Sequence, residues 1–157
     1  MNELQIRPGD VTEAFDYDES PEEISNAFTG RKIANIEPIN AMINRDESEW
    51  FRAEVKITLD DGSRLYAQPN YGWGGQGDGD YETSYITTLE DLQTLGDNII
   101  TKAEAIVERA KEQGDDSVYR LFVFTEHRSI NLMSFTGDTG NGCYGAGFQL
   151  LVVRTAE

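Results

Sequence analysis

WFRAEVKITLDDGSRLYAQ, residues 50–68, is the stretch of sequence whose pattern decides the fold. From Phe51 to Leu59 apolar and polar residues alternate, which is the period of a strand with one buried face. Asp60-Asp61-Gly62-Ser63 follows, and Asp-Gly suits a tight turn because Gly tolerates a positive φ. Arg64–Gln68 then returns as the partner strand. The stretch predicts an antiparallel hairpin.

Apolar runs on both sides of this hairpin predict further strands. The segments with that pattern are 33–43, 85–87, 118–125, 129–136 and 147–155. A short helix is predicted after residue 20, because Ser20-Pro21-Glu22-Glu23 has the order of a capping box. Ile24, Ala27 and Phe28 then share one face, and Gly30 ends the helix. Thr88–Leu92 predicts one further helical turn, which ends at Gly96.

Residues 98–112 fit two structures. Strong helix formers fill 103–111, and their apolar residues are spaced for one helix face. The alternation over 99–107 would serve a strand equally well. Propensity alone favours the helix.

Together these elements predict an α+β fold in a single compact domain, with a mostly antiparallel β-sheet of about seven strands and one or two short helices. We expect this β-rich domain to span residues 20–157. Residues 1–19 show no period and few large apolar side chains, so we expect a loose, acidic N-terminal arm that orders on contact with a partner.

The chain is strongly acidic. Its 13 Lys and Arg against 29 Asp and Glu give 13 − 29 = −16, and residues 1–29 hold eight of the acids against Arg7. A field of that sign repels phosphate backbones, so direct binding of nucleic acid is not expected. It speeds encounter with a basic protein, including one whose groove normally holds nucleic acid. The plain alternative is that the acids keep a small protein soluble.

Several features bear on location. No apolar run is long enough to span a membrane, and no basic N-terminus precedes an apolar stretch as in a signal peptide. The lone Cys143 cannot form an internal disulfide, so nothing requires an oxidising compartment. We expect a soluble, cytoplasmic protein.

Five short segments carry a family resemblance: Gly30–Ile33, Ile57–Ser63, Asp97–Thr101, Tyr119–Val123 and Gly140–Phe148. From Gly30 onward the chain resembles an uncharacterised family of small β-rich proteins from actinobacteria and their phages. The resemblance implies that 98–108 is a strand and that the protein belongs to a phage or prophage context; it brings no catalytic residues. Relatives tend to carry Cys in the Gly-rich loop after the first hairpin, whereas residues 70–82 have none. No zinc or redox role is therefore carried over to this loop.

Candidate catalytic residues are few. His127 is the only imidazole, and its place between Glu126 and Arg128 is typical of an exposed turn. The carboxylates of 77–82 resemble the start of a calcium loop, but the closing Glu is missing. Neither Gly-rich loop, 70–82 or 137–147, matches a phosphate-binding motif. We therefore expect no catalytic residue, no metal site and no cofactor.

What remains is recognition of a partner. Aromatic side chains provide anchor area and carboxylates can meet Arg or Lys, and residues 70–82 and the N-terminal segment supply both. The residues predicted to bind the partner are Asp16, Asp18, Glu19, Glu22, Glu23, Tyr71, Trp73, Asp78, Asp80, Tyr81 and Glu82. The alternative for Trp73 and Tyr81 is that they fold back to cover the sheet.

These observations predict a non-enzymatic, phage-type accessory protein of the host cell cytoplasm. It would bind and inhibit a basic, nucleic-acid-handling host defence protein, such as a CRISPR effector or a restriction enzyme, with carboxylates standing where phosphates normally sit. One alternative is a small-ligand-binding protein or weak enzyme that uses the Gly-rich loops and His127. Another is an immunity protein against a basic toxin, which follows the same electrostatic logic.

Overall fold

Two β-sheets and two short helices make up the part of the chain that the computed structural model describes, which is residues 2–4, 6, 10–17, 21–44, 50–69, 80–96, 98–109, 116–138 and 147–154. In chain order the elements are β1 (Asn2–Leu4), β2 (Val11–Asp16), α1 (Pro21–Phe28), β3 (Ile33–Asn44), β4 (Trp50–Leu59), β5 (Arg64–Pro69), β6 (Asp80–Ile86), α2 (Leu89–Gln93), β7 (Lys102–Glu108), β8 (Ser117–Phe124), β9 (Ser129–Asp138) and β10 (Phe148–Arg154). The predicted α+β fold, a compact and mostly antiparallel single domain, is confirmed.

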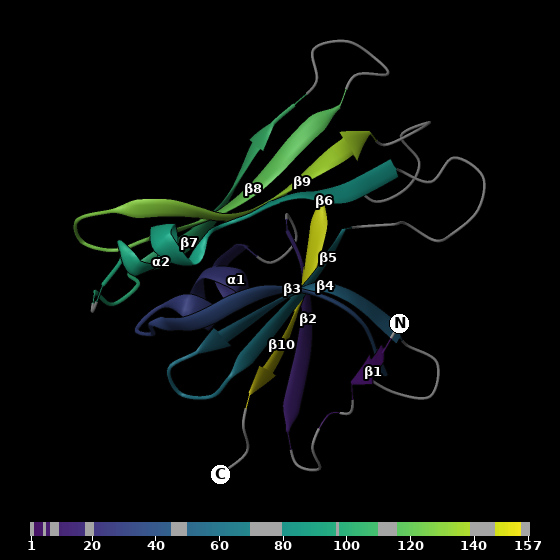
Figure 1. The fold of residues 1–157 in the computed structure, drawn as a ribbon, viewed down its shortest axis with the longest axis horizontal. Coiled ribbons are helices and arrows are strands. Elements are labelled where there is room, and N and C mark those ends of the chain that lie inside the picture. Colours follow the sequence, from purple (N-terminus) through teal and green to yellow (C-terminus); the bar gives the residue numbers. More distant parts are fainter. Residues whose placement is uncertain are drawn as a thin grey trace.

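The strands lie in two layers. The larger sheet has the order β1-β3-β4-β5-β10-β2, and the smaller one has the order β6-β9-β8-β7. Neighbouring strands are antiparallel except β1 and β3, which are parallel. Figure 1 shows the four-stranded sheet above the six-stranded one, with α1 and α2 on the left. A sandwich of this kind buries the inner face of each sheet.

The hairpin predicted at residues 50–68 is confirmed as β4 and β5. Val55 pairs with Ala67 and Ile57 with Leu65, so both strands turn the same apolar face inward. At the turn Gly62 has a φ of +87°, which explains why the turn needs Gly. The hairpin lies inside the six-stranded sheet, with β3 beside β4 and β10 beside β5.

The main core fills the space between the two sheets. The α1 residues Ile24, Ala27 and Phe28 are buried in it, as their spacing predicted. α2 lies within the predicted helical turn and follows its cap residue Thr88, whose Oγ1 accepts a hydrogen bond from the Asp91 main-chain N–H at 3.0 Å. Both predicted helices are therefore confirmed, and each is placed by apolar contacts with the core.

Aromatic rings join the two sheets at one end of the sandwich. The ring of Tyr119 in β8 lies 4.9 Å from that of Tyr17, which follows β2, and 5.5 Å from that of Tyr81 in β6. Beside them Phe148 of β10 stacks on Phe135 of β9 at 5.0 Å. Edge-on and offset contacts of this kind add to the free energy gained from burial.

A second apolar cluster covers the other face of the six-stranded sheet. Its buried members are Ile43, Phe51, Ala53, Tyr66, Leu151 and Val153. In β10 Leu151 alternates with Leu150 and Val152 of the main core, so this strand is buried on both faces. That explains why residues 150–153 read as a continuous apolar run in the sequence. Burial also raises the pKa of Tyr66, although the neighbouring Arg64 acts in the opposite direction.

The N-terminal segment departs from the expectation of a loose arm. Its residues 11–16 form β2, which pairs with β10 from Val11↔Arg154 to Asp16↔Gln149. β2 lies at the edge of the sheet, and its pairing uses main-chain groups that every residue there carries. An edge strand needs no regular apolar period, and for that reason the sequence pattern does not predict it.

The ambiguous segment 98–112 contains a strand, as the family resemblance implied and against the propensity for a helix. β7 pairs with β8 along its whole length, from Lys102↔Phe124 to Glu108↔Val118. On its other edge Ser25 of α1 accepts a hydrogen bond from the Ala103 main-chain N–H at 3.0 Å. Tertiary pairing therefore overrides the local preference.

Gly147 allows the close approach of the aromatic rings. It has a φ of +75°, and a Cβ there would lie 2.6 Å from Cδ1 of Tyr17 and 3.1 Å from Cδ1 of Tyr119. We expect Gly147→Ala to lower the free energy of unfolding by about 3 kcal/mol, through backbone strain and overpacking together. Urea unfolding would measure this loss.

The control is Gly30→Ala, because Gly30 has a φ of +81° but open space around its Cβ position. Only the backbone strain of about 1 kcal/mol applies there. Equal losses at the two positions would show that the ring contacts with Gly147 contribute nothing.

Candidate functional site

The structure describes the side chains of five residues predicted to bind a partner, namely Asp16, Glu22, Glu23, Tyr81 and Glu82. Asp80 is the first residue of β6. The predictions for Asp18, Glu19, Tyr71, Trp73 and Asp78 lie outside the described residues.

Tyr81 is a core residue, and the prediction that it contacts a partner is wrong. Its side chain is 4% exposed, and its ring packs against that of Tyr119. The physical reason is strand alternation, which turns Tyr81 inward and its neighbour Glu82 outward. For this residue the alternative that it covers the sheet is confirmed.

The strand register brings Asp16 and Glu82 to the same end of the sandwich. They are the chain neighbours of Tyr17 and Tyr81, whose rings both contact Tyr119. These two carboxylates come from different sheets and are far apart in the sequence. Asp16 lies on the outer face of the six-stranded sheet beside Gln149, and Glu82 lies on the outer face of the four-stranded sheet beside Thr136.

The first turn of α1 points toward the same end. Thr29 Oγ1 donates to the Thr101 carbonyl oxygen, and Ser25 Oγ accepts from Ala103 further along β7, so the helix runs antiparallel to that strand. Glu22 and Glu23 therefore lie toward the end of the sandwich where β7 finishes and β8 begins.

We call this region the acidic end and define it by Asp16, Glu22, Glu23, Glu82 and Asp116. The last four are exposed, and among the described residues none of their carboxylates has a hydrogen-bond or ion-pair partner. Asp16 differs, because its Oδ1 accepts a hydrogen bond from Nε2 of Gln149 at 2.6 Å. Its carboxylate is thus held on the sheet, whereas the other four are available to a partner.

A groove of about 530 Å³ crosses the outer face of the four-stranded sheet. α2 provides one wall, and β6, β9 and β8 provide the floor. The residues that line it are Ser84, Tyr85, Thr87, Asp91, Thr94, Val118, Arg120, Ile130, Asn131, Ser134 and Thr136. Its size lies within the range of known ligand sites. The sequence pattern did not predict this groove, although the hydroxyl residues at outward positions of β6 and β9 are a signal for a polar strand face.

An irregularity in the strands shapes the floor of the groove. The register of β8 and β9 shifts between Leu121 and Phe122, and the Asn131 amide lies 2.8 Å from Ser134 Oγ beside this bulge. The hydroxyls of Ser84 and Thr136 are hydrogen-bonded at 2.7 Å. Bulges often re-aim side chains next to binding sites, and here one leaves polar groups on the floor.

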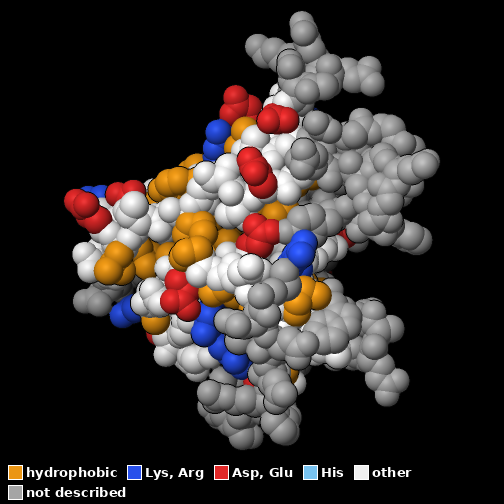
Figure 2. Space-filling view, turned by 45° about the vertical axis from the view of Figure 1, so that its right-hand side comes forward, with side chains coloured by type: hydrophobic (Ala, Val, Ile, Leu, Met, Phe, Trp, Pro, Cys, Tyr) orange, Lys and Arg blue, Asp and Glu red, His pale blue; other side chains and the backbone are white. Residues whose placement is uncertain are grey.

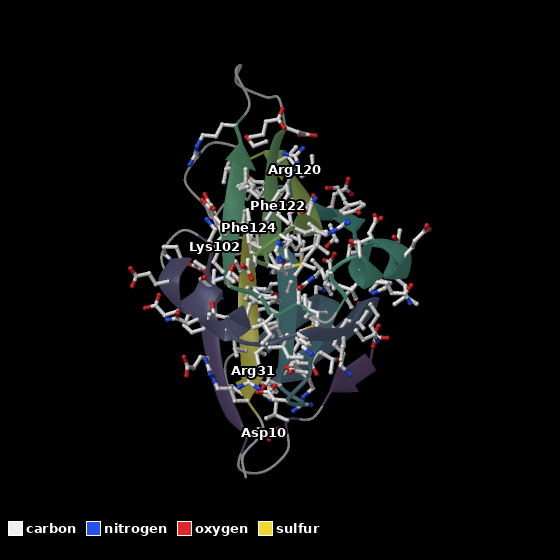
Figure 3. All side chains as sticks on the ribbon, turned by 90° about the vertical axis from the view of Figure 1, so that its left-hand side faces the viewer. Asp10, Arg31, Lys102, Arg120, Phe122 and Phe124 are labelled. Carbon is white, nitrogen blue, oxygen red and sulfur yellow. The ribbon has the colours of Figure 1, made fainter. Side chains whose placement is uncertain are left out.

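Two basic side chains on the same sheet face, Arg120 and Lys102, form ion pairs with glutamates. Arg120 Nη1 lies 3.0 Å from Glu108 Oε2. Lys102 Nζ lies 3.7 Å from Glu104 Oε2 and 4.6 Å from the centroid of the Phe124 ring. Figure 3 shows Lys102, Phe124 and Arg120 one after another along this part of the molecule. Each of these two cations is therefore balanced by a neighbouring glutamate.

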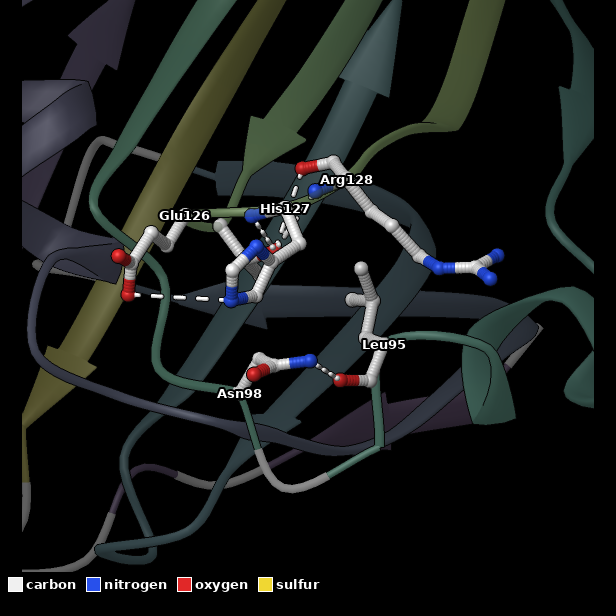
Figure 4. Close-up of polar contacts among 6 residues, drawn as sticks. Leu95, Asn98, Glu126, His127 and Arg128 are labelled. Carbon is white, nitrogen blue, oxygen red and sulfur yellow. Dashed lines mark hydrogen bonds and ion pairs between the residues drawn. The ribbon is translucent and has the colours of Figure 1, made fainter.

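His127 lies in an exposed turn between β8 and β9, as predicted. Its Nε2 is 4.0 Å from Glu126 Oε2, and the two side chains are 69% and 84% exposed. Thr125 Oγ1 accepts hydrogen bonds from the main-chain N–H groups of His127 and Arg128, which hold the turn (Figure 4). His127 is not among the residues that line the groove on the four-stranded sheet.

No group of three His, Cys, Asp or Glu side chains within the described ranges lies close enough together to hold a metal ion. The carboxylate of Asp78 and the thiol of Cys143 lie outside those ranges. Neither described helix is long and apolar enough to cross a membrane.

Comparison with known proteins yields one short similarity. No protein-family model matches the chain, and no solved structure matches it. A stretch of 55 residues is 38% identical to elongation factor 2 of Methanopyrus kandleri. This stretch is 35% of the present chain and spans 4% of the length of that protein. A similarity of this extent does not define a family for the chain.

Asp61 at the β4–β5 turn makes the stability of the fold depend on pH. Burial acts to raise its pKa, but hydrogen bonds from the main chain and hydroxyl of Ser63, together with the Arg31 guanidinium, hold the pKa below its usual range. A carboxyl group with a depressed folded-state pKa stabilises the fold above its unfolded-state pKa of about 3.9. This contribution is lost as the pH falls through the folded-state pKa.

We expect Asp61→Asn to lower the free energy of unfolding at pH 7 by less than about 1 kcal/mol, because the group is partly exposed and screened by solvent. Asn keeps one side-chain oxygen that can accept from the Ser63 N–H, while it removes the charge and the second acceptor oxygen. The difference from the wild type should shrink below about pH 4, as measured by urea unfolding at several pH values. A difference that stays constant down to pH 2 would contradict a role for the charge.

Proposed function

We propose that this protein is a non-enzymatic accessory protein of the phage type, which binds and inhibits a basic, nucleic-acid-handling host defence protein. The observation that carries the proposal is the group of exposed carboxylates at the acidic end, which have no partner among the described residues, in a chain of net charge −16. The phage context is supported by the resemblance of the sequence segments described above.

The electrostatics of the acidic end support binding of a positively charged surface. Glu22 and Glu23 of α1, Glu82 of β6 and Asp116 before β8 come from three separate places in the fold and face solvent. Carboxylates held on a rigid scaffold can stand where phosphates sit in the groove of a nucleic-acid-binding protein. Their field also speeds encounter with such a partner before any contact forms.

Exposed apolar side chains elsewhere on the surface would add contact area to the attraction between charges. Figure 2 shows hydrophobic side chains exposed among acidic and basic ones on the face seen there. The large exposed hydrophobic residues within the described ranges are Tyr85, Leu89, Ile99 and Ile106. A surface that combines apolar area with free carboxylates suits a basic protein better than a bare polycation.

Small-ligand binding is a second candidate function, and the groove on the outer face of the four-stranded sheet favours it. A thermal-shift screen against nucleotides, sugars and divalent ions would separate the two. A ligand at 100 times its dissociation constant should stabilise the fold by about 2.7 kcal/mol. An immunity protein against a basic toxin would use the acidic end in the same way as the first proposal.

The direct test is inhibition of a purified CRISPR effector and of a restriction endonuclease in a DNA-cleavage assay. The double variant Glu23→Gln/Glu82→Gln should need about tenfold more protein for the same inhibition, because two carboxylates at the contact are lost. Inhibition should also weaken steeply between about 0.05 and 0.5 M salt, since the Debye length falls severalfold.

The control is Asp60→Asn/Glu126→Gln, which removes the same number of charges from exposed turns at the opposite end of the strands. It should inhibit as the wild type does. If neither enzyme is inhibited, or if both double variants lose potency equally, the acidic end is not the docking surface.

A further inference from the structure

Asp91 places a negative charge in the wall of the groove. Its main-chain N–H is used by the helix cap, where it donates to Thr88 Oγ1. In the part of the chain that the structure describes, no hydrogen bond or ion pair reaches its exposed carboxylate. The capping of α2 therefore does not use this carboxylate, which is free to pair with a cation that enters the groove.

An exposed aromatic ring lies in the same groove. Tyr85 of β6 is 38% exposed and lines the groove together with Asp91. A guanidinium group stacks on a tyrosine ring and at the same time forms charge-assisted hydrogen bonds to a carboxylate. The hydroxyls of Ser84, Thr94 and Thr136 add acceptors along the floor and wall for its remaining N–H groups.

The charges around the groove favour a cation over an anion. Arg120, the cation in its lining, is paired with Glu108 at 3.0 Å. Glu82 pairs in register with Thr136, which lines the groove, so Glu82 lies beside this part of the groove. Asp91 therefore lies in one wall of the groove, and Glu82 lies beside the part of the groove that Thr136 lines. The positive charge of Arg120 in β8 is balanced by Glu108 in β7.

We propose that this groove binds an arginine side chain of the basic partner, with Asp91 as its ion-pair partner and Tyr85 as its stacking surface. The inference rests on the proposed function and deepens it, because it adds an anchoring pocket to the long-range attraction of the acidic end. Arginine fits better than lysine, since its planar group can stack and donate in a fork at once.

The test is an NMR titration of the ¹⁵N-labelled full chain with the peptide acetyl-Gly-Arg-Gly-amide. Saturable shift changes are expected at the main-chain amides of residues 84–94 and 130–136. The neutral peptide acetyl-Gly-Gln-Gly-amide should cause none. Asp91→Asn should weaken binding roughly tenfold through loss of the charged acceptor, and Tyr85→Leu should weaken it severalfold through loss of the ring.

Glu90→Gln is the matched control, because Glu90 lies beside Asp91 in the first turn of α2 and does not line the groove. It makes the same change in net charge and should bind the arginine peptide as the wild type does. Equal weakening in both variants, shifts outside the groove, or equal shifts with the neutral peptide would each overturn the proposal.

The outcome is independent of the cleavage assay. If the arginine peptide fails to bind while the acidic end still inhibits a nuclease, the pocket is wrong and the proposed function stands. If the peptide binds through Asp91 while no basic nuclease is inhibited, the pocket stands and the proposed function is wrong.

Discussion

The contact of three tyrosine rings is the constraint on which the arrangement of this protein depends. Tyr17 and Tyr81 both meet the ring of Tyr119, and Gly147 provides the space for this because it has no Cβ. These contacts tie the edge of one sheet to the interior of the other. Because Asp16 precedes Tyr17 and Glu82 follows Tyr81 in the chain, these ring contacts also bring Asp16 and Glu82 to one end of the molecule.

The same packing separates two kinds of charged group. On the outer face of the four-stranded sheet, Arg120 and Lys102 are paired with glutamates. At the acidic end and in the wall of the groove, carboxylates remain without partners among the described residues. In the proposed interaction, these carboxylates would attract a basic partner over a long range, and the groove beside Glu82 would bind its arginine. Such a combination would give fast encounter as well as selection of a partner by shape.

The fold was predictable where local chemistry and burial agree. The alternation from Phe51 to Leu59 and the Asp-Gly turn identified the central hairpin, and Ile24, Ala27 and Phe28 identified the buried face of α1. The strand over 102–108 was predicted only through the family resemblance, because its residues favour a helix until β8 offers a pairing partner. β2 was missed, because an edge strand pairs through its main chain and needs no apolar period.

The sequence by itself determined the class of fold, the surplus of negative charge and the exposed turn around His127, because these depend on composition and on neighbours along the chain. The tertiary structure decided that Tyr81 is buried while Glu82 is exposed, and that Asp16 is held by Gln149. It alone formed the groove in which Asp91 and Tyr85 meet. The physical reason is that a binding surface joins residues from separate strands, and only the packing of the two sheets sets the distances between them.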